Sequence, residues 1–415
     1  MLNRRDFLRS AGGLVSFPLS PFPACGAPRP KREAGIVIWA AHSLYPERRK
    51  EPIDEALVRG WIKHYADHGI TAIHWRGSYV GKATYPSKIL PVMKRADKPA
   101  YVVSGPWEAS GEAWTKSVDT FNQIAEGIQG LDTLSVGLDE AKRLGLAFYA
   151  NVTPFDKYFP GLEENYYEEH PDLWLWSRDQ NMRYRGVPCY ADPAAAEHLL
   201  EEVRELLDRG VDGISFGLES HMGAGPGKGN DEYGFNPPVV RMFRERWVTN
   251  IISEEFDRSK LYQLNGEMLT GLFKNIRKII GPTKKLIAQT WLGGYGLRGN
   301  RWGSDPMGTY IVYGGTYRIH LDWHGWMKAG IADDLLVALT ADVDSTGDVQ
   351  NFVKNKITKG NVILMRKPNV PELLPVVRGE LEKVRAGALD GYVIHEGAYF
   401  EPRHTQWCEL LGAPG

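Results

Sequence analysis

The feature that most constrains the fold is a repeated alternation of strand-like apolar runs with helix-sized segments. It is clearest over residues 187–221. There Asp192 and Pro193 are suited to begin a helix, and Gly210 is suited to end it. A short apolar run follows and stops at Leu218, as expected of a buried strand. Helix and strand units of this kind are typical of proteins built on a parallel sheet.

Eight such runs occur along the chain, each followed by a helix or by a segment long enough to hold one. The predicted strands cover residues 35–40, 69–75, 146–152, 214–218, 285–291, 331–340, 362–365 and 392–395, and helices are predicted over 52–68, 138–144 and 239–280. Eight strands is the number in a (β/α)8 barrel. The first strand is followed by His42 to Pro46, and not by the glycine-rich turn of an open dinucleotide-binding sheet. We therefore predict an α/β fold, a (β/α)8 TIM barrel with long insertions after strands 2, 3 and 4.

Size and charge fit one large domain. The chain has 415 residues, of which 43% are hydrophobic, and one barrel with insertions can account for residues 31–415. A formal net charge of −1 gives no reason to expect nucleic acid or an anionic membrane as a partner. The 13 Trp and 19 Tyr residues fit either a large core or a cleft that stacks on sugars.

The N-terminus resembles an export signal. Asn3 to Leu8 resembles the twin-arginine motif and precedes a weakly apolar stretch too short to span a membrane, which needs about 20 apolar residues. We predict that residues 1–30 are a signal peptide and linker, read by the twin-arginine export machinery, and that the protein is periplasmic or extracellular. A disordered basic tail is the alternative. Lipid attachment at Cys25 is disfavoured by the residues before it, and Cys25, Cys189 and Cys408 form neither a disulfide framework nor a zinc pattern.

Glu219 is the leading catalytic candidate. It directly follows the fourth predicted strand, and in a barrel the carboxyl ends of the strands carry the active site. The apolar strand before it would raise the pKa of its carboxyl group and suit it to act as an acid. A structural role in an ion pair with an arginine is the alternative.

Glycoside hydrolysis needs a second carboxyl group on the other side of the scissile bond. We favour Glu396, which follows the eighth predicted strand as Glu219 follows the fourth; Asp342, Asp344 and Asp156 are the alternatives.

Other residues at strand ends are candidates for binding a substrate rich in hydroxyl groups. The predicted substrate-binding residues are Trp39, His42, Trp75, Arg76, Asn151, His221, Trp291, Asp342, Arg366, His395 and Tyr399. The histidines and tryptophans have an equally plain alternative role in packing, and the two arginines one in neutralising carboxylates. Because these residues include no His-X-His or cysteine cluster, no metal and no cofactor are expected.

Four segments resemble the glycosyl-hydrolase-like family 10, a group of barrel proteins presumed to act on carbohydrate. They are 138–146 (LDEAKRLGL), 170–174 (HPDLW) with Asp192-Pro193, 211–214 (VDGI), and 322–326 (DWHGW) with 330–333 (GIAD). The resemblance runs from about Gly35 to Phe400 and implies a (β/α)8 barrel. After the fourth strand this family has an aspartate-rich segment, where the present chain has Gly217-Leu218-Glu219-Ser220-His221. Either Glu219 replaces the family's acid, or the chemistry has drifted or been lost.

Three functions follow from these observations. The first is an exported glycoside hydrolase acting on a poly- or oligosaccharide through Glu219 and Glu396. The second is a barrel that binds carbohydrate without catalysis. The third, disfavoured by the histidine spacing, is a metal-dependent hydrolase using His42, His221 or His395 with aspartates.

Overall fold

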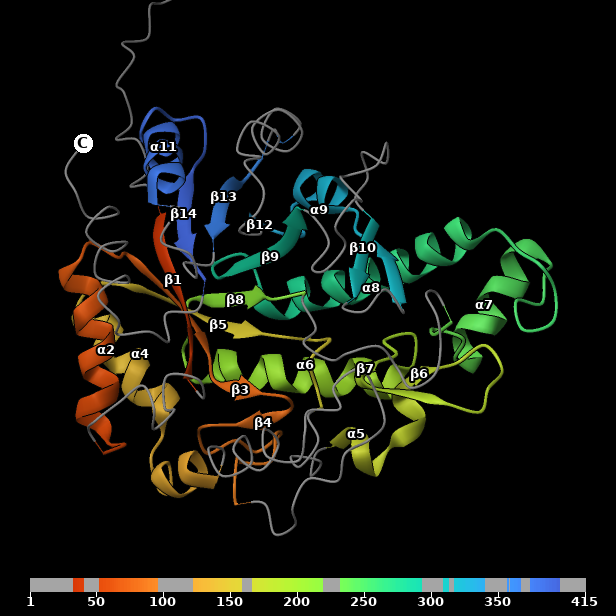
Figure 1. Ribbon diagram of the computed structural model, residues 1–415, viewed down its shortest axis with the longest axis horizontal. Coiled ribbons are helices and arrows are strands. Elements are labelled where there is room, and N and C mark those ends of the chain that lie inside the picture. Colours follow the sequence, from red (N-terminus) through yellow and green to blue (C-terminus); the bar gives the residue numbers. More distant parts are fainter. Residues whose placement is uncertain are drawn as a thin grey trace, which may run out of the picture. The chain divides into compact units, whose positions relative to one another are not determined.

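Eight parallel strands close into a barrel in the computed structural model of this chain (Figure 1). The structure describes residues 33–40, 52–95, 122–158, 166–218, 232–292, 309–312, 317–339, 357, 359–366 and 374–395. In the order in which they pair, the strands are β1 (Glu33–Trp39), β14 (Gly391–Ile394), β13 (Asn361–Arg366), β12 (Asp334–Leu339), β9 (Lys285–Leu292), β8 (Gly213–Phe216), β5 (Ala147–Val152) and β2 (Ala72–Arg76). The predicted (β/α)8 barrel is confirmed.

Helices surround this barrel and fill the connections between its strands. The helices include α2 (Glu55–Asp67), α4 (Thr133–Arg143), α5 (Tyr166–Glu169), α6 (Pro193–Asp208), α7 (Pro237–Trp247), α8 (Arg258–Ile280), α9 (Trp323–Ala329) and α11 (Leu374–Arg385), with a 3-10 turn, η2 (Pro171–Leu173). Asp192 caps α6 by accepting from the Ala194 N–H, with Pro193 in the first turn, as predicted. Helix α4 begins five residues earlier than the predicted residue 138, because Asp132 caps it through the Ser135 N–H.

Three small two-stranded sheets lie outside the barrel in the described part of the chain. They are β3 (Ser78–Tyr79) with β4 (Lys82–Ala83), β6 (Trp174–Trp176) with β7 (Arg183–Pro188), and β10 (Thr309–Val312) with β11 (Tyr317–His320). The first belongs to the insertion after β2 and the second to the insertion after β5. Both insertions follow the carboxyl end of a barrel strand, which is the side on which barrels build their sites.

The alternation of side chains along each strand fixes which residues face the interior. Lys285 Nζ lies 3.7 Å from Glu33 Oε2, although β9 and β1 are opposite strands, four places apart in the barrel order. The two side chains can meet only through the interior. On the other face, Phe216 packs on Phe273 of α8, so Ser215 points inward.

A polar cluster closes the interior at the amino end of the strands. Glu33 contacts His74 at 3.2 Å, and Lys285 contacts Asp334 at 2.6 Å. Asn361 donates to the other oxygen of Asp334 at 2.6 Å. Pairing with His74 and Lys285 lowers the pKa of Glu33 although burial opposes it. The charges in this cluster are therefore largely compensated.

A repeated contact joins strands in pairs at the same end. One residue stands just before each of the strands β2, β8, β12 and β14. Its side chain accepts a hydrogen bond from the backbone N–H of a residue in the preceding barrel strand. Its own backbone N–H donates to the carbonyl of that same partner residue. The four pairs are Thr71 with Ala34, Asp212 with Phe148, Asp333 with Leu286, and Asp390 with Val362. We call these residues the strand clamps.

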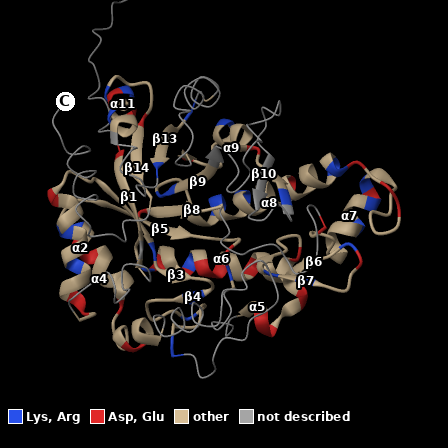
Figure 2. Cartoon of the chain, viewed as in Figure 1, with Lys and Arg blue, Asp and Glu red and all other residues tan. Residues whose placement is uncertain are grey.

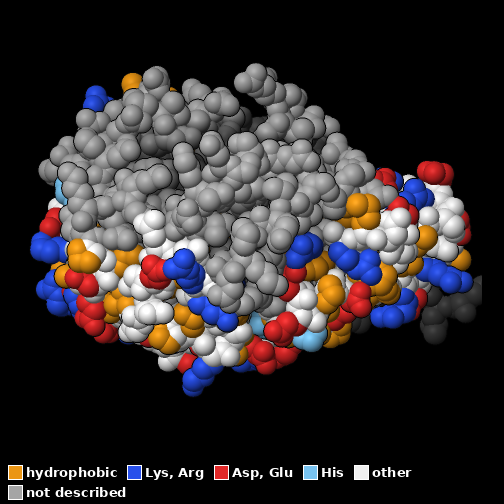
Figure 3. Space-filling view, turned by 60° about the horizontal axis from the view of Figure 1, so that its bottom comes forward, with side chains coloured by type: hydrophobic (Ala, Val, Ile, Leu, Met, Phe, Trp, Pro, Cys, Tyr) orange, Lys and Arg blue, Asp and Glu red, His pale blue; other side chains and the backbone are white. Residues whose placement is uncertain are grey.

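Charged residues lie mainly on the surrounding helices, such as α2 and α6 (Figure 2), and acidic and basic side chains are interspersed on the described surface (Figure 3). Within the described residues, no helix has both the length and the apolar character needed to span a membrane.

Candidate functional site

The candidate site is the interior layer at the carboxyl end of the strands. Alternation brings polar side chains into this layer from five of the eight strands. The inward residues here are Arg76 on β2, Asn151 on β5, Ser215 on β8, Gln289 on β9 and His395 directly after β14, and all are at most 4% exposed. On β12 and β13 the same layer is apolar, with Ala338 and Met365. A barrel interior is ordinarily filled by branched apolar residues, so the polar layer at this end is the candidate site.

Asn151 and Ser215 form the centre of the polar side. Asn151 Nδ2 donates to the Ser215 carbonyl at 3.3 Å and to its hydroxyl at 3.4 Å. A carbonyl can only accept, so the amino end of this amide must face Ser215. The Asn151 carbonyl oxygen is thereby turned the other way, toward Gly217.

Gly217 leaves open the space between two amide groups. A Cβ atom at this position would lie 3.5 Å from Gln289 Oε1 and 3.7 Å from Asn151 Oδ1. It would also lie 3.2 Å from the Thr153 methyl group, which is tight. The glycine therefore lets two acceptor oxygens converge on a point that no side chain of the described residues occupies.

Arg76 of this layer forms a buried ion pair with Asp156. Arg76 Nη2 donates to Asp156 Oδ2, and the side chains are 1% and 0% exposed. Arg76, predicted to bind substrate, lies at the carboxyl end of β2 and is held by this ion pair. Asp156, one of the alternative catalytic partners, is engaged by that arginine.

The loop that carries Asp156 is held from two sides. Lys157 Nζ lies 2.8 Å from Glu202 on α6, with both side chains buried, and the Tyr190 hydroxyl donates to the Pro154 carbonyl at 2.6 Å. Burial, followed by the charge of Lys157, lowers the pKa of nearby His198 to about 4. The position of Asp156 thus depends on contacts that the loop makes with α6 and with Tyr190, which precedes that helix.

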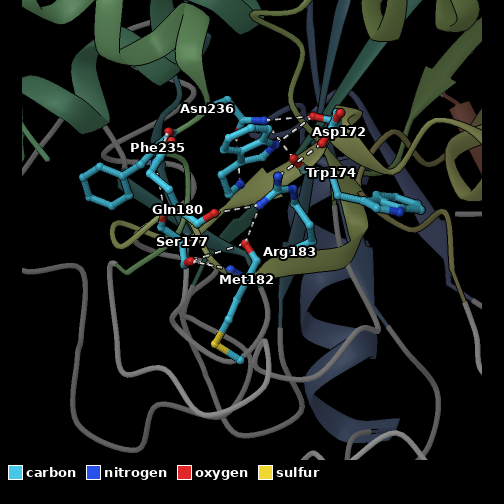
Figure 4. Close-up of polar contacts among 9 residues, drawn as sticks. Asp172, Trp174, Ser177, Gln180, Met182, Arg183, Phe235 and Asn236 are labelled. Atoms are coloured by element: carbon cyan, nitrogen blue, oxygen red, sulfur yellow. Dashed lines mark hydrogen bonds and ion pairs between the residues drawn. The ribbon is translucent and has the colours of Figure 1, made fainter.

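The hairpin β6–β7 belongs to the same insertion and is fixed by a polar cluster (Figure 4). Asn236, which precedes α7, accepts from the Trp176 N–H at 3.0 Å and donates to the Trp174 carbonyl at 2.8 Å. Arg183 lies 3.4 Å over the Trp176 ring and donates to Asp172 at 3.2 Å. These contacts tie the insertion after β5 to the segment that follows β8.

Two predicted substrate-binding residues point away from the interior. Trp75 stacks on Phe148 with ring centroids 5.9 Å apart and lies against Gly137 of α4, so the indole lies between the barrel and that helix. Arg366 pairs with Glu380 of α11. Successive side chains of a strand point to opposite faces. His74 and Met365 face the interior, so their neighbours Trp75 and Arg366 point outward. These two side chains belong to the packing between barrel and helices, which corrects the expectation that they line the rim.

The remaining predictions divide in two. Asn151 and His395 face the interior, as a binding role requires. Trp39 and Trp291 lie on β1 and β9, where only their backbone is described. The predicted residues outside the described part of the chain are Glu219, Glu396, His42, His221, Asp342, Asp344 and Tyr399.

Sequence reasoning missed Ser215, Gly217 and Gln289. Ser215 interrupts the run Gly-Ile-Ser-Phe, and Gln289 interrupts the run Leu-Ile-Ala-Gln. A lone polar residue within a buried strand is a signal that would have found both, because it needs a partner or a ligand. Among the described residues, no group of three or more His, Cys, Asp or Glu side chains is arranged to hold a metal ion.

Comparison with known proteins supplies no assignment. No protein-family model matches the chain, and no curated protein matches it. The chain is distantly similar to the glycoside hydrolase domain of PelA from Pseudomonas aeruginosa, with 10% identity, coverage of 89% of this chain and 97% of that chain, and a TM-score of 0.40. For a β-N-acetylhexosaminidase from Bacteroides fragilis the identity is 11%, the coverages are 92% and 68%, and the TM-score is 0.44. For tryptophan synthase from M. tuberculosis the identity is 11%, the coverages are 92% and 93%, and the TM-score is 0.36. Because enzymes of unrelated chemistry share the barrel fold, these similarities do not identify the activity of this protein.

Proposed function

We propose that this protein is an exported glycoside hydrolase that binds a poly- or oligosaccharide in the mouth of its barrel. The observation that carries the proposal is the inward layer of amide, hydroxyl and imidazole groups at the carboxyl end of the strands. Donors and acceptors of this kind are what a polyhydroxylated ligand requires. The apolar side of the layer, at Ala338 and Met365, suits the carbon face of a sugar ring.

The proposed catalytic pair is Glu219 with Glu396. In sequence, Glu219 comes three residues after the end of β8, and Glu396 two residues after the end of β14. These strands are opposite in the barrel, four places apart in the pairing order. Groups that follow opposite strands can approach a sugar in the mouth from two sides, as glycoside hydrolysis requires.

The chemistry is divided between the two carboxyl groups. Glu219 protonates the oxygen of the leaving sugar, and Glu396 either attacks the anomeric carbon or removes a proton from the attacking water. A separation of about 5–5.5 Å leads to retention of configuration, and one of about 6.5–9.5 Å to inversion. Arg76 and His395 face the same space.

The test is hydrolysis of a panel of polysaccharides and aryl glycosides by the mature protein and three variants. Glu219→Gln and Glu396→Gln should each lower the rate by about 10²–10⁴-fold, the usual contribution of general acid–base catalysis. Glu382→Gln changes an exposed glutamate on α11 and is the matched control. Full activity in both site variants would refute the assignment. Retention of the protein on a glycan column without hydrolysis would favour the binding barrel, a role that the same polar layer would support.

Export is a separate part of the proposal. It rests on Arg4 and Arg5 within the motif at residues 3–8. Replacing both with lysine should retain the protein inside the cell, measured by fractionation of a host with a twin-arginine system. Unchanged export of that variant would refute this route.

A further inference from the structure

Gln289 carries a buried hydrogen-bond donor that no described residue accepts from. The residue is 1% exposed and faces the interior, and among the described residues its Nε2 atom has no hydrogen-bond partner. A buried amide without a partner destabilises the folded state. An energetically unfavourable group aimed into a barrel mouth points to a ligand that completes its hydrogen bonds.

The surroundings of Gln289 define the shape of that ligand group. Gln289 Oε1 and Asn151 Oδ1 converge on the open position beside Gly217, at 3.5 and 3.7 Å from where a Cβ atom would lie. Asn151 is held in this orientation by its bonds to Ser215. The position thus offers two acceptors next to one free donor.

We infer that Gln289, Asn151 and Gly217 form a subsite for two neighbouring hydroxyl groups on a neutral sugar ring. One hydroxyl accepts from Gln289 Nε2, and the other donates to Gln289 Oε1 or Asn151 Oδ1. A hydroxyl group is suited to both roles because it donates and accepts. The inference rests on the proposed function for the sugar class, and it extends that function to residues that set specificity.

The subsite excludes other ligand groups by its chemistry. The side chains around Gly217 that define it, from Gln289, Asn151, Ser215 and Thr153, are uncharged, so a carboxylate or phosphate gains no ion pair from them. An apolar group would leave the Gln289 donor unpaired. A sugar lacking one of the two hydroxyls should therefore bind less well than its parent.

The test measures binding and stability together. The mature protein is titrated calorimetrically with methyl glycosides of glucose, galactose, mannose and xylose, and with deoxy analogues of whichever binds. Gln289→Leu should weaken binding roughly tenfold, the value of about one hydrogen bond, and should no longer distinguish the parent from its deoxy analogue. The same variant should raise Tm without ligand, because an unpaired buried amide is removed. A variant that merely damaged the fold would lower Tm.

Gly217→Ala tests the open position independently. Its new methyl group would lie beside the two acceptor oxygens and should also weaken binding. Gly137→Ala is the matched control, because that buried glycine of α4 lies on the outer face and its Cβ would meet Phe148 at an ordinary 3.5 Å. Unchanged affinity in both Gln289→Leu and Gly217→Ala, or a lower Tm in Gln289→Leu, would overturn the inference, as would failure of the wild type to bind any of the glycosides.

Binding is measured apart from hydrolysis, so the two proposals can fail separately. Glycosides that bind through Gln289 but are not hydrolysed would refute the enzyme and leave the subsite standing. If hydrolysis depends on Glu219 but binding does not change in Gln289→Leu, the subsite would be refuted and the proposed enzyme would stand.

Discussion

Arg366 of β13 and Glu380 of α11 form a buried bidentate ion pair, with side chains only 1% and 2% exposed. Arg366 Nε lies 2.9 Å from both carboxylate oxygens, and Nη2 donates to one of them. The Tyr392 hydroxyl of β14 donates to the same carboxylate at 3.2 Å. One carboxylate thus connects α11 to two neighbouring strands of the barrel.

Replacing Arg366 with methionine should destabilise the protein strongly. Glu380 would remain buried without its cation, and breaking a buried pair in this way typically costs about 3–5 kcal/mol. The free energy of unfolding, measured by urea denaturation, should fall by that amount. A loss below about 1 kcal/mol would mean that the pair is not desolvated as its burial indicates.

Two further variants separate the buried charge from the loss of packing. Arg366→Met combined with Glu380→Leu removes both charges and should recover much of the stability, since apolar replacements of buried pairs are often neutral. Arg246→Met removes a cation from an exposed pair with Glu267, with side chains 44% and 45% exposed. That control should change stability by less than about 1 kcal/mol.

The same pair explains where prediction from sequence stops. The number and order of the barrel strands follow from alternating apolar runs and helices, and they were predicted correctly. The face of the strand on which Arg366 lies was predicted wrongly. Residues 362–365 are apolar throughout, so no alternation of polar and apolar residues indicates which side chains face the interior. Arg366 was therefore expected at the rim, although its place in β13 turns it toward α11.

The polar interior shows the reverse case. Asn151 was predicted as a binding residue because it lies near the carboxyl end of a predicted strand. Ser215 and Gln289 were overlooked because each lies within an apolar run that was expected to be buried throughout. The hairpin β6–β7 was missed within an aromatic segment, since its three-residue strand is too short for a periodic signal. Contacts such as that of Asn236 with Trp174 join residues far apart in sequence, and no local pattern indicates them.

Lys285 should stabilise the barrel by compensating two carboxylates at its amino end. Lys285→Met would leave Asp334, which is 1% exposed, with Asn361 as its remaining described polar partner. Because the lysine side chain is itself 37% exposed, the expected loss is nearer about 2 kcal/mol than the larger value for a fully buried pair. Urea denaturation at pH 7 measures it, and an unchanged free energy of unfolding would contradict the prediction.

The loss in Lys285→Met should also depend on pH. Burial already raises the pKa of Asp334, and without the lysine that rise should be larger. A carboxyl group with a raised pKa in the folded state lowers stability as pH rises above the unfolded value of about 3.9. The difference between wild type and variant should therefore be smaller at pH 4 than at pH 7. A difference independent of pH would argue against ionised Asp334 as the cause.

His198 should make the protein less stable in acid. Burial lowers its pKa to about 4 in the folded state, while the unfolded chain keeps a value near 6.5. Between these values the unfolded state binds the extra proton, so the contribution is fully present above pH 6.5 and is lost as pH falls toward 4. Its size is on the order of 1–3 kcal/mol.

His198→Phe isolates this contribution. The ring of His198 stacks on Tyr166 at 4.0 Å, a contact that phenylalanine can keep. The variant should lose less stability than the wild type when the pH is lowered from 7 to 4.5, measured by urea denaturation at both values. Equal losses in the two proteins would assign the acid sensitivity to other groups.

Each strand clamp should contribute to the free energy of unfolding in proportion to the number of hydrogen bonds that it makes. Asp212, Asp333 and Asp390 each accept a backbone N–H at 2.8 Å, and Asp333 also accepts from Arg277 at 2.5 Å. Replacing Asp212 or Asp390 with alanine should cost about 1–2 kcal/mol, and Asp333→Ala should cost more, because the Leu286 N–H and Arg277 both lose a partner.

Asparagine variants distinguish the hydrogen bond from the charge. Asp212→Asn keeps an acceptor for the Phe148 N–H and should lose less stability than Asp212→Ala. Asp333→Asn should fall between wild type and Asp333→Ala, because it keeps an acceptor but loses the ionic part of the Arg277 contact. Equal losses for asparagine and alanine at both positions would show that the clamps do not act through these bonds. Since all four clamps join strands at the end opposite the candidate site, their loss should lower stability without altering affinity for a ligand in the barrel mouth.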